Sequence, residues 1–496
     1  MTERFGVVIV GGGSAGAVLA AGLSEDPGSR VLLLEAGPDH ISADTPANIA
    51  STNCFMAWTE PGRLWPALRA VRADGHRERI YLRGRGVGGS SSVNAMATIR
   101  GTAEDYQRWA DEFGCDGWGW AEMLAAFLQI EDDVDYGGDG LHGRGGPIPV
   151  SRLPLGTTSP VDRAMRAAVA NLGYPIADDY HAEGATGLSR WAFSMSDGRR
   201  VSTNDAYLES ARKRPNLEIR GDSHVDRVAI EEGRATGVVL VDGSVIEACE
   251  VILCAGAIHS PAILLRSGVG VQDALPVGKN LKEHPSARID VTLRPAGRRS
   301  ATRESVVRSV LRYGSDLADA GPNDMQIGAF DLVGSTEADL ANAQFFTAVM
   351  RVFSHGEVRL RSADPLQDPR VEFRLLSDER DLLRLRDGVR RLVKVIAHPA
   401  VATIIEHVDA PLEQLDTAEG VDAWLRNTVN DYVHAVGTCR MGHPDDPAAV
   451  VDLRCQVIGY QDLFVCDASI MPDLPTCNTH LTTVAVAQRW LDLRTG

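Results

Sequence analysis

The sequence is short of positive charge. Its 50 lysine and arginine residues stand against 67 aspartate and glutamate residues, which gives a formal net charge of −17 over 496 residues. A protein that binds nucleic acid needs a positive surface for the phosphate backbone. The charge balance therefore argues against a nucleic-acid partner.

The cysteines lack the spacing of a metal cluster or of a redox dithiol. None of them belongs to a C-x-x-C pair; the eight cysteines are Cys54, Cys115, Cys249, Cys254, Cys439, Cys455, Cys466 and Cys477. Zinc clusters and dithiol sites commonly use such pairs. We therefore expect no metal site, reduced thiols and a cytoplasmic location.

Long apolar runs are also missing. The N-terminal run Phe5–Val10 stops at a glycine after six residues, which is too short for a signal peptide. No uncharged stretch is long enough to span a bilayer, so no integral membrane segment is expected. The remaining composition, 44% hydrophobic and 24% charged, is that of an ordinary globular protein whose length favours two domains.

The informative features begin with a strand, a glycine-rich turn and a helix at the N-terminus. The apolar run Phe5–Val10 is typical of a buried parallel strand, and glycines follow it at the G-x-G-x-x-G positions Gly11, Gly13 and Gly16. A second apolar strand, Val31–Leu34, ends on Glu35, where a carboxylate can accept hydrogen bonds from an adenosine ribose. This pattern predicts a dinucleotide-binding unit, and it does not separate NAD from FAD.

Further motifs run through the chain in a recognisable order. They are Arg83–Asn94, Cys254–Pro261 with Ser267 and Gly268, His434–Gly442, Val465–Pro472 and Asn478–His480. Together they closely resemble the signatures of the glucose-methanol-choline (GMC) oxidoreductases, and the resemblance spans essentially the whole chain. It implies FAD as cofactor and an α/β fold, with a discontinuous Rossmann-like FAD-binding domain and an α+β substrate domain that contains an antiparallel sheet.

The resemblance and the glycine-rich turn together predict the cofactor site. The residues expected to contact FAD are Gly11, Gly13, Ser14, Gly16, Glu35, Ala36, Arg85, Gly88, Gly89, Ser90, Asn94, Ala95, Val225, Ala255, Gly256, Asp467, Ala468, Asn478 and Thr479. Some members of the family attach FAD covalently through a histidine at the place occupied here by Val93. Because valine cannot form that bond, we expect a non-covalent cofactor.

The last motifs are expected to carry the chemistry. The family places one histidine after the substrate domain and a second histidine or asparagine on the final segment, and the register puts these on His434 and His480. Imidazole is suited to taking a hydroxyl proton at neutral pH, so His434 is predicted as the base and His480 as its hydrogen-bonding partner. Asn478 is expected to contact cofactor or backbone, and His284 is interpreted as structural. The run from Thr479 predicts a buried helix whose N-terminus faces the flavin and stabilises negative charge there.

The positions of the motifs divide the chain. The FAD-binding domain is expected over 1–155, 200–287 and 430–496, and the substrate domain over 156–199 and 288–429. Within the substrate domain, strands at 345–350 and 357–360 favour an antiparallel sheet, with helices at 378–396 and 421–429 covering one face.

Three functions are consistent with these features. The favoured one is oxidation of an alcohol to an aldehyde or ketone by base-assisted hydride transfer to flavin N5, with O2, a quinone or a redox carrier as electron acceptor. A flavin-containing hydroxynitrile lyase and a non-catalytic flavin carrier are the alternatives. The specific small-molecule alcohol and the oligomeric state do not follow from the sequence.

Overall fold

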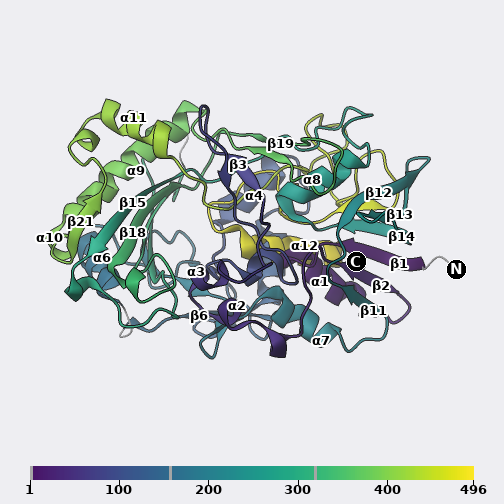
Figure 1. Ribbon diagram of the computed structural model, residues 1–496, viewed down its shortest axis with the longest axis horizontal. Helices are drawn as coiled ribbons and strands as arrows, with labels where there is room; N and C mark the ends of the chain where they lie inside the picture. The colour runs from purple at the N-terminus through teal and green to yellow at the C-terminus, as the bar shows by residue number, and fades with distance from the viewer. Residues whose placement is uncertain (1–3, 156–158, 318–320, 496) are drawn as a thin grey trace.

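A mixed sheet, mainly parallel, forms one half of the computed structural model, which describes residues 4–155, 159–317 and 321–495 (Figure 1). Its seven strands run in the order β11-β2-β1-β14-β13-β12, with β22 paired to β14. The strands are β1 (Arg4–Val10), β2 (Val31–Leu34), β11 (Leu217–Arg220), β12 (Val225–Glu231), β13 (Arg234–Leu240), β14 (Val245–Leu253) and β22 (Leu463–Val465). β12, β13 and β14 pair antiparallel, and the other neighbours pair parallel. Because β1 and β2 lie in the centre, their apolar runs are buried almost throughout.

Helices cover this sheet, and the first helix of the chain packs against the last one. α1 (Ser14–Leu23) packs against α12 (Thr479–Thr495), and α5 (Trp120–Ile130) packs against α12 from another side. The remaining helices of this half are α2 (Ala47–Ala50), α3 (Cys54–Ala57), α4 (Ala103–Asp111), α7 (Glu209–Ala211) and α8 (Gly256–Arg266). α12 is buried over most of its first three turns, as its apolar sequence predicts.

A six-stranded antiparallel sheet forms the other half, on the left of Figure 1. Its strands, in spatial order, are β21 (Ile405–Asp409), β15 (Ser286–Leu293), β18 (Asn342–Val349), β17 (Met325–Phe330), β16 (Ser309–Tyr313) and β7 (Gly187–Arg190). α9 (Glu379–Ala397) lies on β17 and β18, and α6 (Pro160–Asn171), α10 (Pro399–Ala402) and α11 (Ala418–Thr428) pack around α9 and the same face. The opposite face of the sheet is left for the cavity described below.

One predicted strand belongs to a different sheet. The segment expected at 357–360 forms β19 (Glu357–Arg359), which pairs with β20 (Arg370–Glu372) and not with β18. β20 in turn pairs with β3 (Arg69–Val71), and β3 with β4 (Arg79–Ile80). The alternation of a three-residue strand shows which side chain is buried, but it carries no information on which sheet the strand joins.

Short sheets and the remaining features complete the fold. β5 (Glu131–Asp133), β6 (Ile148–Arg152) and β8 (Ala192–Phe193) form one small sheet, and β9 (Met195–Ser196) and β10 (Arg199–Arg200) form another. Among the described residues, no helix combines the length and apolar character needed to cross a membrane. All eight cysteines have free thiols. The domain boundaries and the cytoplasmic location stay predictions.

Candidate functional site

The glycine-rich turn after β1 is tight enough to require glycine at two positions. Gly11 has φ of +105°, and a Cβ there would lie 2.6 Å from the backbone oxygen of Cys254. A Cβ on Gly16 would lie 1.9 Å from the oxygen of Gly11, so this glycine lets α1 pack closely on the turn. The strand, turn and helix therefore have the geometry of a dinucleotide-binding unit.

Glu35 connects this turn to two other loops. One carboxylate oxygen accepts a hydrogen bond from the backbone N–H of Gly12 at 2.8 Å. The other accepts from the N–H groups of Gly37 and Gly86, both at 2.9 Å. The carboxylate fixes the loops that surround the expected ribose position, and Glu35 also lines the cavity itself.

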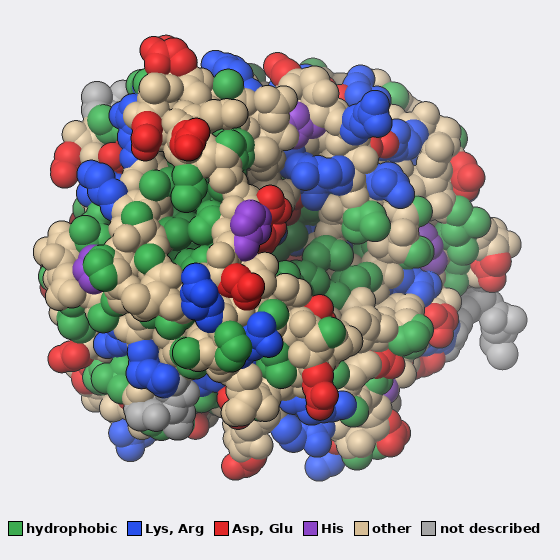
Figure 2. All heavy atoms as spheres, turned by 60° about the vertical axis from the view of Figure 1, so that its left-hand side comes forward, with side chains coloured by type: hydrophobic (Ala, Val, Ile, Leu, Met, Phe, Trp, Pro, Cys, Tyr) green, Lys and Arg blue, Asp and Glu red, His purple; other side chains and the backbone are tan. Residues whose placement is uncertain are grey.

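A single continuous cavity collects most of the predicted residues. Its lining includes Gly11, Gly13, Ser14, Glu35, Ala36, Gly89, Ser90, Asn94, Ala95, Val225, Ala255, Gly256, Asp467, Ala468, Asn478, Thr479, His434 and His480. Figure 2, in which the side of the antiparallel sheet comes forward, shows a hollow bordered largely by hydrophobic side chains, with a histidine and with acidic and basic side chains at its edge.

Three predicted cofactor residues do not line the cavity. Gly16 lies behind the turn and serves helix packing. The Arg85 guanidinium donates a hydrogen bond to the backbone oxygen of Ala36 at 2.7 Å, so it supports a lining residue from outside. The N–H of Gly88 donates to the oxygen of Gly12 at 2.8 Å, and its φ of +81° shapes the turn that precedes Gly89.

The chemistry of the lining fits FAD. A Cβ on Gly256 would meet no atom within 4 Å, although its N–H is held by Asp467 at 2.7 Å, so space is left beside the backbone. Two buried polar atoms in the lining, Oδ1 of Asn478 and Nε2 of His480, have no hydrogen-bond partner among the described residues. Small residues, an acid at the ribose position and unsatisfied polar atoms at the far end are what a flavin dinucleotide requires.

At the wall of the cavity, the side chains of His284, His434 and Asn478 meet. Nδ1 of His434 lies 2.9 Å from Nδ1 of His284, and Nε2 of His434 lies 3.2 Å from Nδ2 of Asn478. With the Asn478 amide donating, Nε2 of His434 carries the lone pair, and its Nδ1–H donates to His284. Burial lowers the pKa of His434 well below its usual value, with the neighbouring His284 and Arg83 adding to the effect. His434 is thus a neutral base with its accepting nitrogen beside Asn478.

A buried acid holds the backbone of this base. Glu283 accepts hydrogen bonds from the N–H of His434, at 2.7 and 2.9 Å, and from the N–H of Tyr432 at 3.2 Å. The Tyr81 hydroxyl donates to it at 2.9 Å. Burial, together with the charge of Asp431, raises the pKa of Glu283 to about 8. Glu283 contacts the main chain of His434 and not its ring, so its contribution is to placement.

His480 occupies a different position from the one that the sequence predicts. Its Nδ1 lies 3.1 Å from the Ser14 hydroxyl at the start of α1, and Asn478 takes the place beside His434. Asn478 is the residue before α12 and His480 is the second residue of that helix, and the two side chains contact different partners where α12 begins. Burial lowers the pKa of His480 to about 4, which keeps its ring neutral in the cavity wall.

His284, which the sequence interpretation took as structural, contacts the ring of His434 directly. Its ring is fully buried against His434, with an interplanar angle of 86°, and burial lowers its pKa to about 3. The contact joins residues 150 positions apart. The only local signal is a histidine next to an acid at the entry to an apolar strand, which also suits a structural role.

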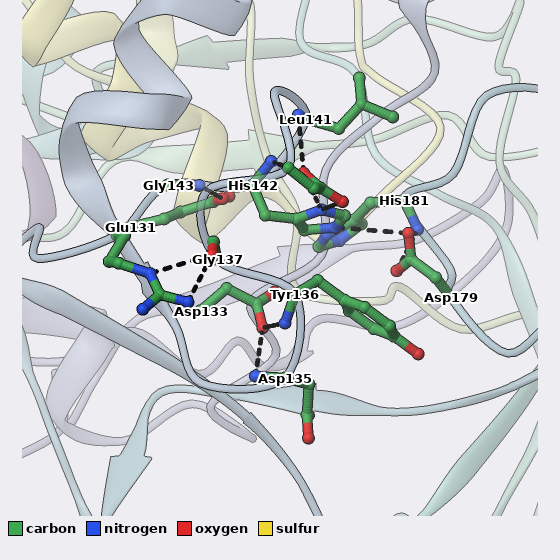
Figure 3. Close-up of polar contacts among 12 residues, drawn as sticks. Glu131, Asp133, Asp135, Tyr136, Gly137, Leu141, His142, Gly143, Asp179 and His181 are labelled. Carbon is green, nitrogen blue, oxygen red and sulfur yellow. Dashed lines mark hydrogen bonds and ion pairs between the residues drawn. The ribbon is translucent and has the colours of Figure 1, made fainter.

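A second histidine cluster lies away from the cavity lining, in the loops around β5 and β6 (Figure 3). His142 and His181 stack with ring centroids 5.7 Å apart, and Asp179 completes a group whose ligand atoms lie within 4.8 Å of one another. Nε2 of His181 accepts a hydrogen bond from the backbone N–H of Arg100 at 3.1 Å, which puts the ring proton on Nδ1. With Nε2 engaged by the main chain and Nδ1 protonated, His181 has no lone pair available for a metal ion.

The fold and cavity define a dinucleotide-binding oxidoreductase, and comparisons with known proteins specify it further. The sequence profile of GMC oxidoreductases matches residues 5–286 and 352–487. The chain is 38% identical over 535 residues to 5-(hydroxymethyl)furfural oxidase of Methylovorus sp. (strain MP688), covering 99% of each chain. It is 33% identical over 547 residues to the oxygen-dependent choline dehydrogenase of Escherichia coli O17:K52:H18 (strain UMN026 / ExPEC), covering 99% of this chain and 96% of the relative. The crystal structure of pyridoxine 4-oxidase from Mesorbium loti matches with a TM-score of 0.88 at 32% identity, covering 99% of each chain.

The chain therefore belongs to the GMC oxidoreductase family. Its relatives are flavin-dependent alcohol oxidases and dehydrogenases, which confirms the predictions of FAD as cofactor and of alcohol oxidation as the reaction. The hydroxynitrile lyase and flavin-carrier alternatives find no support among these relatives.

Proposed function

We propose that this enzyme oxidises a small-molecule alcohol, with Nε2 of His434 as the proton acceptor and Nδ2 of Asn478 as the group that orients the hydroxyl. The observation that carries the proposal is the 3.2 Å contact between these two nitrogens in the lining of the cavity that suits FAD. This assignment gives Asn478 the role that the sequence predicted for His480.

The neutral state of the His434 ring supports its role as the base. FAD, when bound, accepts the hydride that leaves the carbinol carbon. His434 is neutral because of its burial, so it can take the hydroxyl proton at Nε2. The imidazolium formed in this way is stabilised by the adjacent alkoxide, and by the hydrogen bond from its Nδ1–H to His284. Asn478 donates to the oxygen on which negative charge develops.

The proposed cofactor is held without a covalent bond. Val93 lines the cavity at the position that carries the flavin-linking histidine in some relatives, and its backbone oxygen accepts a hydrogen bond from Nε1 of Trp58 at 2.9 Å. An alkyl side chain offers no nucleophile to the flavin ring. Acid precipitation of the holoenzyme should therefore release the yellow chromophore into the supernatant.

An anaerobic panel of alcohols tests the assignment. Benzyl, furfuryl and pyridylmethyl alcohols, with choline for comparison, are mixed with the oxidised holoenzyme, and loss of the flavin absorbance is followed. We expect at least one primary alcohol to bleach the flavin, and re-oxidation by air compared with quinones then identifies the acceptor. A flavin that stays oxidised with every alcohol contradicts the proposal.

A further inference from the structure

The wall of the cavity opposite the FAD-binding half comes from one face of the antiparallel sheet. Arg288 on β15 pairs with Phe346 on β18, and Gln344 on β18 pairs with Phe330 on β17. Side chains alternate across a strand, so these four share one face. Arg288, Gln344 and Phe330 line the cavity, which places a guanidinium and an amide in an otherwise aromatic wall.

The charge of Arg288 has no carboxylate partner within the described residues. Its Nη2 donates to the backbone oxygen of Asp431 at 2.8 Å, and no ion pair with an acid accompanies that bond. The Asp431 carboxylate is instead paired with Arg72 at 2.7 Å, both side chains being buried. The other acid on this face, Asp290, accepts from Nε2 of Gln344 at 2.6 Å.

A second cation adds to the positive potential at this end of the cavity. Arg79 is close enough that the charges of Arg72 and Arg288 both act on it, and burial together with the Arg72 charge lowers its pKa. Arg72, Arg79 and Arg288 are therefore close to one another, and among them Arg72 forms the ion pair with the Asp431 carboxylate. A half-buried cation without a counter-ion in a cavity is costly, and an anionic ligand would remove that cost.

Aromatic rings connect the base to this cation. The Tyr432 ring lies 4.8 Å from that of His434 and 5.6 Å from that of Phe346, and Phe346 lies 5.3 Å from Phe330. Phe346 is the strand partner of Arg288. A flat substrate that rests on Tyr432 and Phe330, which line the cavity, would place its hydroxymethyl group near His434 and its opposite end near Arg288.

We propose that Arg288 binds a carboxylate on the substrate, so that the preferred alcohols are aryl alcohols with an acidic group at the end opposite the carbinol. This inference rests on the proposed function, because it assigns the substrate class of the same site. Bidentate contact with a carboxylate uses the N–H groups that the Asp431 oxygen does not occupy. The same charge disfavours a quaternary ammonium alcohol such as choline.

The first test uses substrates matched in shape and different in charge. The holoenzyme is reduced anaerobically with 4-(hydroxymethyl)benzoate, 4-(hydroxymethyl)benzamide and benzyl alcohol. We expect kcat/KM for the benzoate to exceed that for the benzamide by at least tenfold. In Arg288→Gln that ratio should fall to about one, whereas Arg294→Gln should keep it. Arg294 is the matched control because it follows the same strand, is held by the Ile405 oxygen at 2.9 Å and lies outside the cavity lining.

The second test does not depend on turnover. Benzoate, which has no hydroxyl to oxidise, is titrated into the oxidised holoenzyme while the flavin spectrum is recorded, with benzamide as the neutral comparison. We expect benzoate to bind at least tenfold more tightly than benzamide, and Arg288→Gln to abolish the difference. Equal binding of the two compounds overturns the inference even if alcohols bleach the flavin. Preferential benzoate binding without bleaching by any alcohol instead contradicts the proposed function and leaves the anion site standing.

Discussion

The two histidine clusters use the same side chain in opposite electrostatic surroundings. His434 is flanked by His284 and Asn478, neither of which carries a negative charge, and burial lowers its pKa. His142 is flanked by Asp139 at 3.0 Å and Asp179 at 3.3 Å. Although burial opposes it, the hydrogen bonds to these two acids raise the pKa of His142.

The difference teaches what each cluster can do. A neutral imidazole whose accepting nitrogen faces a cavity can take a proton from a ligand, whereas an imidazole held between two carboxylates binds its own proton more readily and ties loops together. In Figure 3 His142, on the loop that follows β5, reaches the segment that carries Asp179. Catalysis is therefore expected from the first cluster and stability from the second.

The largest expected effect is the loss of the base. His434→Ala should lower kcat/KM for the best alcohol by about 10³-fold, because a positioned general base contributes about 10²–10⁴-fold. The measurement is the anaerobic rate of flavin reduction, normalised to bound FAD. His142→Ala serves as the control and should stay within about threefold of the wild-type enzyme. Similar losses in the two variants would remove the contrast between the clusters.

A smaller loss of activity is expected from substitution of Asn478, and it distinguishes this residue from His480. Asn478→Ala removes the donor beside His434 and should lower kcat/KM by about 10–100-fold, somewhat less than the roughly 10²–10³-fold typical for loss of one oxyanion donor. His480→Ala removes the partner of Ser14, and we expect a loss of at most about tenfold. Single-turnover reduction at saturating alcohol measures both. A larger loss in His480→Ala than in Asn478→Ala would instead support His480 as the partner of His434.

The smallest effect is on stability, and it depends on pH. Because the folded-state pKa of His142 is raised, its protonated form stabilises the fold fully below the unfolded value of about 6.5. This stabilisation is lost as pH rises through the folded pKa. His142→Gln should therefore lower the melting temperature by a few degrees at pH 5.5 and by less at pH 8.5. A difference that grows towards alkaline pH would contradict the charge assigned to His142.

Local and motif-based features of the fold could be predicted from the sequence. The turn at Gly11 and Gly16 and the buried helix from Thr479 depend on interactions within short segments, and both lie where they were expected. The motif order also placed His434 in the cavity. These predictions succeeded because backbone approach and apolar periodicity leave direct marks in the sequence.

The remaining features depend on directions and distances that short patterns do not encode. Whether Asn478 or His480 faces His434 depends on how the chain enters α12 at Thr479. The contact between His284 and His434 depends on how β15 enters its sheet, and the sheet that β19 joins depends on β20 and β3. Each of these is a tertiary choice among locally equivalent arrangements.

The small sheet of β19, β20, β3 and β4 affects the length of ligand that the cavity can hold. It hydrogen-bonds residues 69–80 to residues 357–372, and further backbone bridges join Lys282 to Val436 and Ser286 to Asn430. These main-chain hydrogen bonds hold the segment that carries His434 at a fixed distance from the antiparallel sheet. We therefore expect the enzyme to select ligands by length as well as by charge, since widening the gap would require breaking main-chain hydrogen bonds.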